Sequence, residues 1–186
     1  MIEPILVVAF PLVFAAVMAA GMASLRRRKI DMEGRAPIDK TVFLVSKLAM
    51  IVPWTFMVLQ GFGVGLLPIR VPPLLRWVSV ALWISGWALV LAGRLGLGSS
   101  FRVGCPNEET ALRTDGVYRL SRNPMYLGLN ATMLAAALYT LNPLVLIVGA
   151  AIAVVHHRII LAEEECLLKM FGRDYEEYRG RVGRYL

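Results

Sequence analysis

The sequence has little charge, little histidine and almost no cysteine for a chain of 186 residues. Only 18% of the residues are charged, whereas 58% are hydrophobic, and the mean hydropathy is +0.63. An ordinary soluble domain has about 25% charged and about 45–50% apolar residues. A 20.6 kDa globule cannot bury such an apolar excess, so the composition excludes a typical water-soluble domain and indicates a membrane protein.

The few cysteines and histidines also limit the chemistry. Cys105 and Cys166 are too few for a disulfide scaffold and lack the CxxC spacing of a zinc site, so we expect ordinary thiols. His156 and His157 are adjacent and cannot point the same way on a helix. A two-histidine metal site is therefore not expected.

Four long uncharged runs dominate what is present: Pro4–Leu25, Leu48–Ile69, Trp77–Gly93 and Asn123–His157. A bilayer core about 30 Å thick needs roughly 20 helical residues to cross it. The last run has 35 residues, too many for one crossing, and Asn142-Pro143 near its middle favours a turn. The runs predict an all-α integral membrane protein with five transmembrane helices.

The basic residues predict how these helices are oriented. The net charge is +7, and 17 of the 20 Lys and Arg fall after the first, third and fifth predicted helices. The opposite side has only Arg70 and Arg76, and Lys47 lies at the start of the second helix. Because cytoplasmic loops carry an excess of Lys and Arg, we expect a multi-pass protein with its N-terminus outside and its C-terminus cytoplasmic. Charge in this pattern indicates membrane lipids as neighbours and no nucleic-acid partner.

Two cytoplasmic segments are longer than a membrane hairpin requires. The connection from Arg94 to Arg122 has nearly thirty residues, and loops of this length are usually functional or disordered. The C-terminal tail continues the fifth helix to Lys169. Phe171-Gly172 is then typical of a helix end, and Asp174 is typical of the start of a further, short helix.

Acidic residues emerge from the fifth helix as Glu163-Glu164-Glu165. Such runs are usually solvated helix ends. His156, however, is seven residues before Glu163 and shares its helix face, which makes a polar stripe from the membrane boundary outward. Arg158 at this boundary is explained equally well by snorkelling toward lipid headgroups or by a site.

The segment Gly116–Gly128 leads into the fourth predicted helix. Pro124 is placed where the first turn of a helix tolerates proline. The unpaired amides there can receive a carboxylate, although a purely structural helix start explains the same residues.

Four features together resemble a known family: GVYRLSRNPMYLG at residues 116–128, the Asn142-Pro143 hairpin, EEECLLKMFGRDYEEY at residues 163–178 and the closing GRVGRYL. They resemble the isoprenylcysteine carboxyl methyltransferases, within the wider membrane methyltransferases that include phospholipid methyltransferases. The resemblance implies that S-adenosyl-L-methionine binds between the long cytoplasmic loop, the last two transmembrane helices and the C-terminal tail. It also implies that a lipophilic substrate enters from the bilayer. Residues 1–93 are then three N-terminal transmembrane helices with a basic loop, and residues 94–186 the catalytic region.

The resemblance also implies cofactor-binding residues. They correspond to Thr110, Ala111, Leu112, Arg113, Tyr118, Asn123, Pro124, Met125, Tyr126 and Glu163. Asn123 stands where the family usually has histidine, and it keeps a donor and an acceptor but cannot titrate. The family's substrate-orienting arginine falls at Ile159, whereas this chain has Arg158 one step, about 100° of helix, earlier. Arg158 is the candidate for that role, with Arg181 and Arg184 as substitutes.

The expected reaction is methyl transfer, and the acceptor decides which residues act. A carboxylate acceptor needs a cation to orient it, which would be Arg158. An amine must first lose a proton, and the candidate bases are His156 and Glu164. The resemblance favours carboxyl methylation of an isoprenylcysteine-like acceptor. The alternatives are N-methylation of a phospholipid amine, a nicotinamide-dependent membrane reductase and a non-catalytic lipid-binding membrane protein.

Overall fold

The computed structural model describes residues 2–27, 34–65, 67–105 and 110–186. Within these ranges the regular structure is helical apart from one isolated β-bridge between Arg35 and Cys105, which confirms the all-α prediction. The elements are α1 (Ile2–Arg27), α2 (Lys40–Ala49), α3 (Ile51–Gly61), α4 (Pro73–Leu97), η1 (Gly98–Ser100), η2 (Gly116–Arg119), α5 (Pro124–Thr140), α6 (Pro143–Phe171) and α7 (Arg173–Arg181).

Four helical segments in the described residues are long and apolar enough to cross a membrane: Ile2–Ser24, Lys40–Gly61, Pro73–Ser100 and Pro143–Phe171. The chain is therefore a multi-pass integral membrane protein. The remaining long helix, α5, has 17 residues and a length of about 25 Å, less than the usual hydrocarbon thickness. The fifth span and the orientation of the termini stay predictions, as does the domain division at residue 93, which α4 runs across.

The second membrane segment starts earlier than predicted and is broken in two. Asp39 caps α2, its Oδ1 accepting from the amides of Thr41 and Val42 at 3.0 Å. The break at Met50 follows from Pro53, which has no N–H to donate to the carbonyl of residue 49. Because α2 begins at Lys40, Lys47 lies near the end of α2 and not at the start of the membrane segment, where the sequence predicted it.

The predicted hairpin between the last two long helices is confirmed. Leu141 ends α5 in the left-handed conformation, at φ 46°. The side chain of Asn142 then accepts from the amide of Leu144 at 2.9 Å, and Pro143 occupies the first turn of α6. The chain therefore reverses, and α6 runs back alongside α5.

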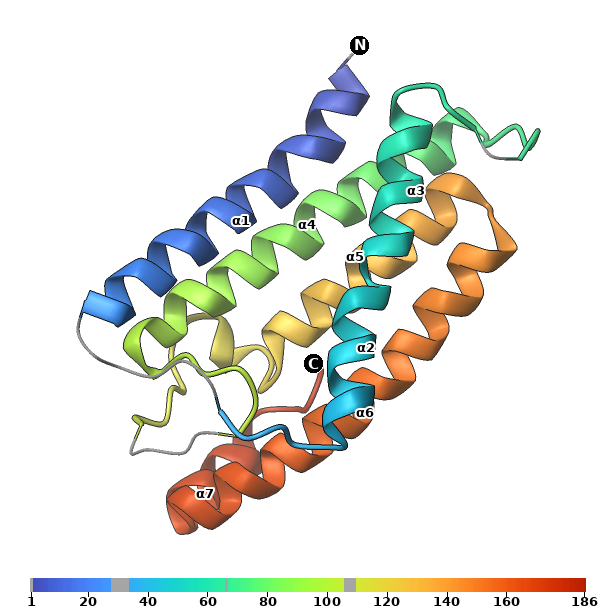
Figure 1. The fold of residues 1–186 in the computed structure, drawn as a ribbon. Coiled ribbons are helices and arrows are strands. Elements are labelled where there is room, and N and C mark those ends of the chain that lie inside the picture. The colour runs from blue at the N-terminus through green and yellow to red at the C-terminus, as the bar shows by residue number, and fades with distance from the viewer. Residues whose placement is uncertain (1, 28–33, 66, 106–109) are drawn as a thin grey trace.

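The bundle is held together most closely where α4 crosses α5. A Cβ added to Gly128 would lie 2.5 Å from the carbonyl oxygen of Gly86, so only glycine permits this approach. The rings of Trp54, Trp83 and Trp87 pack in the middle of the bundle at centroid distances of 4.9–6.5 Å. In Figure 1, α1 lies alongside α4, while α2 and α3 form one nearly continuous rod across the bundle.

A polar clamp fixes α1 to the end of the bundle where α4 begins. The Glu3 carboxylate pairs with Arg76 of α4 and accepts from the hydroxyl of Tyr139 of α5 at 2.8 Å. Gln60 of α3 donates to the carbonyl of Tyr139 at 2.8 Å. Four helices thus meet at this end, and the residues singled out for chemistry lie at the other end.

Candidate functional site

The α5–α6 hairpin brings Tyr126 and Glu163 together, 37 residues apart in sequence. The Tyr126 hydroxyl donates to Oε1 of Glu163 at 2.9 Å, and both side chains are half-buried. The ring of His156 lies edge-on to that of Tyr126, with centroids 5.3 Å apart. Nδ1 of His156 is 2.6 Å from Oδ1 of Asn130, a contact that in the neutral ring requires the tautomer with its proton on Nδ1 and leaves Nε2 as the acceptor. The predicted polar stripe of α6 is therefore a cluster shared with α5.

Glu164, in contrast, is enclosed and saturated with donors. Arg122 binds both of its oxygens, through Nη2 at 3.0 and 3.2 Å and Nε at 3.2 Å. Nδ2 of Asn123 donates to Oε1 and Nε of Arg184 to Oε2, each at 3.0 Å. A carboxylate committed to three cationic or amide partners holds segments together and is poorly placed to remove a proton from a substrate.

The C-terminal tail folds back over the start of α5. The amide of Arg122 donates to the carbonyl of Gly183 at 3.0 Å, and the hydroxyl of Ser121 to the carbonyl of Arg184 at 3.2 Å. The predicted helix end at Gly172 is confirmed, with φ 50°. The short α7 that follows buries Tyr178, whose hydroxyl donates to the carbonyl of Tyr118 at 2.7 Å. Burial raises the pKa of Tyr178 to about 12, so this donor keeps its proton at neutral pH.

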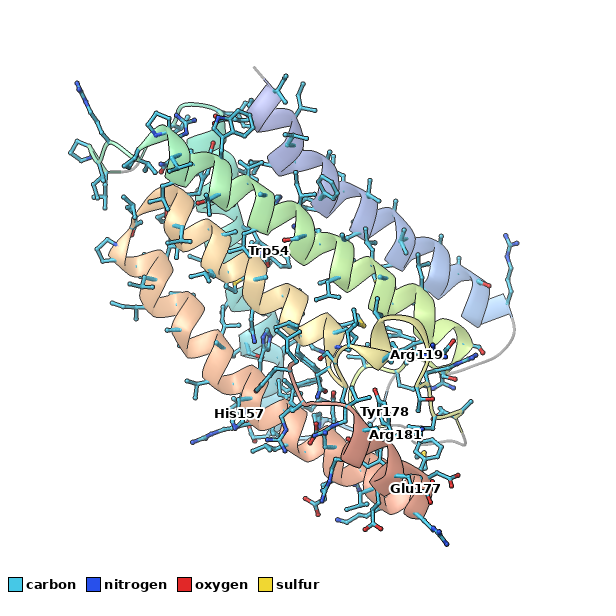
Figure 2. The ribbon with its side chains drawn as sticks, turned by 180° about the vertical axis from the view of Figure 1, so that it is seen from behind. Trp54, Arg119, His157, Glu177, Tyr178 and Arg181 are labelled. Carbon is cyan, nitrogen blue, oxygen red and sulfur yellow. A yellow bond between two sulfur atoms is a disulfide. The ribbon has the colours of Figure 1, made fainter. Side chains whose placement is uncertain are left out.

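Figure 2 shows the same arrangement from behind, with Tyr178, Arg181 and Glu177 of α7 grouped at one end of the bundle and Trp54 between the helices. Trp54 donates to Thr132 of α5 at 3.1 Å, deep in the bundle. The candidate site thus lies between the tryptophan-rich core and a tail that closes that end of the molecule.

The long connection reaches the same end, and here the structure corrects the sequence-based expectation. Cys105 and Cys166 are not ordinary thiols but form a disulfide, with Cα atoms 6.0 Å apart. The bond attaches the loop to α6 three residues beyond Glu163. Arg35 and Cys105 also exchange two backbone hydrogen bonds, at 2.8 and 2.9 Å. The sequence spacing of 61 residues carries no signal of this pairing.

The predicted cofactor-binding residues make different contacts, and not all of them face the Tyr126–Glu163 pair. The hydroxyl of Thr110 is 3.8 Å from the sulfur of Met170, near the end of α6. The amide of Ala111 donates to the hydroxyl of Ser100 at 3.3 Å. Tyr118 is buried, and its hydroxyl donates to the carbonyl of Gly93 at 3.1 Å.

The Asn-Pro-Met-Tyr segment starts α5 as predicted. Pro124 occupies the first turn of the helix, and Met125 packs against Gly93. The Asn123 amide is directed to Glu164 and to the carbonyl of Arg184. Tyr126 alone of the four reaches Glu163 with its side chain, while Asn123 joins the enclosed Glu164 network.

The structure does not bring Arg158 to the cluster. Its side chain is exposed, while Ile159 is 2% exposed and occupies the inward face, as the 100° step predicts. The neighbouring His157 is also exposed and contacts the Tyr185 hydroxyl at 2.6 Å. The two substitutes are committed elsewhere, because Arg181 binds the carbonyl of Glu177 and Arg184 binds Glu164.

A cation to which the sequence analysis assigned no role lies on the helix that packs against α6. Lys47 lies on α2, which packs against α6, and its charge acts electrostatically on the Glu163 carboxylate. The helical spacing from Phe43 and Ser46, both buried, is the signal that places Lys47 on the inward face.

Two groups among the predicted cofactor-binding residues suit parts of a cofactor that carries an amino acid and a ribose. Glu163 is a half-buried acceptor, suited to hydroxyl or ammonium donors. Nε of Arg113 is buried and has no hydrogen-bond partner among the described residues, which suits a carboxylate. S-adenosyl-L-methionine contains all of these groups.

The family of the chain follows from a match to a family model. The model of the phospholipid methyltransferase family matches residues 74–174, more than half of the chain. The chain belongs to this family. The matched segment contains α5, α6, all of α4 but its first residue, the Tyr126–Glu163 pair and Glu164 with Arg122 and Asn123, whereas Arg184 lies beyond it.

A solved structure shows a similar fold. It is the eukaryotic intramembrane Ras methyltransferase, an isoprenylcysteine carboxyl methyltransferase, with a TM-score of 0.57 and 22% sequence identity. The similarity covers 89% of this chain and 59% of that enzyme, so the chain spans about three-fifths of its length. A search of curated protein sequences finds no match.

Proposed function

We propose that this membrane protein transfers a methyl group from S-adenosyl-L-methionine to a lipophilic acceptor that enters from the bilayer. The observation that carries the proposal is the Tyr126–Glu163 pair, which lies within the segment matched to a methyltransferase family. Membership of that family favours methyl transfer over the reductase and the non-catalytic alternatives.

The residues present suggest how the cofactor is held. Glu163 accepts hydrogen bonds from the hydroxyl or ammonium groups of the cofactor. The Tyr126 hydroxyl fixes the orientation of the Glu163 carboxylate. Arg113 pairs with the carboxylate of the cofactor through the buried Nε. When bound, S-adenosyl-L-methionine supplies an electrophilic methyl group on a sulfonium.

The contribution of the protein to such a displacement is alignment of the acceptor. Positioning of reacting groups supplies on the order of 7–11 kcal/mol in well-oriented systems. Glu164 acts here as a positioning residue, because its bonds to Arg122, Asn123 and Arg184 fix the start of α5 and the tail around the site.

The acceptor we favour is a carboxylate, as in an isoprenylcysteine, which is nucleophilic without losing a proton. The similar fold of the isoprenylcysteine carboxyl methyltransferase supports this choice. A phospholipid amine is the second candidate, supported by the name of the family and by His156, whose Nε2 can accept a proton.

The test is methyl transfer by purified protein from labelled S-adenosyl-L-methionine to N-acetyl-S-farnesylcysteine or to phosphatidylethanolamine. We expect a base-labile methyl ester on the acid, and loss of the product in Glu163→Gln. Glu165→Gln is the matched control, since Glu165 is exposed and, among the described residues, forms an ion pair only with Lys169 in the next turn. Base-stable label on the amine lipid alone would refute the carboxylate acceptor, and no label on either would refute the function.

A further inference from the structure

The inward face of α2 carries a charge that its membrane position makes costly. Val42, Leu44, Val45 and Leu48 are exposed on the outward side, where lipid surrounds a transmembrane helix. Lys47 lies on the opposite side with the buried Phe43 and Ser46, and it is half-buried. Its ammonium is 3.7 Å from the centroid of the Phe43 ring. Lys47 thus lies on the half-buried side of α2, and its ammonium is held over an aromatic face.

The other cations considered for the site are occupied, directed away or, like Arg113, assigned to the carboxylate of the cofactor. Arg122 and Arg184 bind Glu164, and Arg158 is exposed to the surroundings of the bundle. Lys47 interacts electrostatically with Glu163 but forms no ion pair within 4.0 Å among the described residues. It is therefore available to an anion placed between α2 and α6.

The cost of a half-buried ammonium in the membrane is offset when an anion binds beside it. A carboxylate acceptor is such an anion, and it needs a cation to orient it toward the methyl donor. A cationic amine lipid at the same place would be repelled.

We propose that Lys47 binds the carboxylate of the methyl acceptor and thereby selects acids over amines. The inference rests on the proposed function for the identity of the reaction, but the binding preference exists without turnover. Lys47 is then an acceptor-binding residue contributed by the N-terminal half of the chain, outside the segment matched to the family.

The test compares two ligands that differ only at the head: N-acetyl-S-farnesylcysteine and its uncharged carboxamide. Their affinities for detergent-purified protein are measured by calorimetry, with and without S-adenosylhomocysteine. We expect the wild type to prefer the acid by roughly ten- to a hundredfold, the range of a charge-assisted hydrogen bond. Lys47→Met should bind both equally, with the amide affinity unchanged, and Lys47→Arg should retain the preference. Lys40→Met, at the exposed start of the same helix, is the control.

Two results would overturn the proposal. One is equal affinity of the wild type for acid and amide. The other is a Lys47→Met variant that keeps the acid preference. If its affinity for S-adenosylhomocysteine also falls, Lys47 is only a counter-ion of Glu163. Failure of the proposed function gives a different result, because the wild type then binds neither S-adenosylmethionine nor S-adenosylhomocysteine. The preference for the acid over the carboxamide, measured without cofactor, still decides the role of Lys47.

Discussion

The enclosed Glu164 network predicts a large loss of stability when its carboxylate is removed. The side chains of Glu164 and Arg122 are only 7% and 8% exposed. In Glu164→Gln the Arg122 guanidinium stays buried without a counter-charge, and breaking a buried pair on one side costs about 3–5 kcal/mol. For a chain of this size each kcal/mol lowers the midpoint of thermal unfolding by about 2–4 °C, so we expect a fall of about 6–20 °C.

The assay is thermal unfolding of wild type and variant in the same detergent, followed by far-ultraviolet circular dichroism. The control is Glu165→Gln, because the Glu165–Lys169 pair is 64% and 74% exposed and screened by solvent, so its loss should leave the midpoint nearly unchanged. The double variant Glu164→Gln/Arg122→Gln should lose less than the sum of the two single variants, since both charges are then absent.

Equal midpoints for Glu164→Gln and Glu165→Gln would refute the reasoning. Strict additivity in the double variant would do the same, because it would mean that the two charges do not interact. Arg184→Gln should fall between the extremes, as that side chain is 35% exposed.

Two further predictions concern the frame around the site. Reduction of the Cys105–Cys166 disulfide, or Cys105→Ser, should lower stability by about 2–4 kcal/mol, measured as a lower midpoint in detergent; an unchanged midpoint and unchanged electrophoretic mobility on reduction would argue against the bond. Gly128→Ala should lower the free energy of unfolding by about 1–3 kcal/mol, because the new methyl group clashes with the carbonyl of Gly86. Gly180→Ala is the control and should cause no such loss, because no atom lies within 4 Å of the added Cβ. A Gly128→Ala variant as stable as wild type would contradict the close helix approach.

Local signals predicted those parts of the fold that depend on neighbouring residues. The hairpin at Asn142-Pro143 and the helix end at Gly172 are determined by backbone preferences within a few residues, and both are confirmed. The meeting of Tyr126 with Glu163 could also be anticipated, because the hairpin returns the chain to its starting side.

Features that depend on distant partners could not be read from the sequence. Three adjacent glutamates look alike in the sequence, yet Glu163 is half-buried beside Tyr126, Glu164 is enclosed by Arg122, and Glu165 is exposed. These differences arise from residues about 40 positions away. The Cys105–Cys166 bond has the same origin. The early start of the second membrane segment was missed because Lys47 interrupts the uncharged run, although its inward position is compatible with a membrane helix.

The most direct test of the account is calorimetric titration of purified protein with S-adenosyl-L-methionine. The account predicts saturable binding by the wild type and by Glu165→Gln, and affinity reduced by about 1.5–3 kcal/mol in a folded Glu163→Gln variant, the contribution of a hydrogen bond to a charged group. A wild type that does not bind the cofactor, or a Glu163→Gln variant with unchanged affinity, would contradict it.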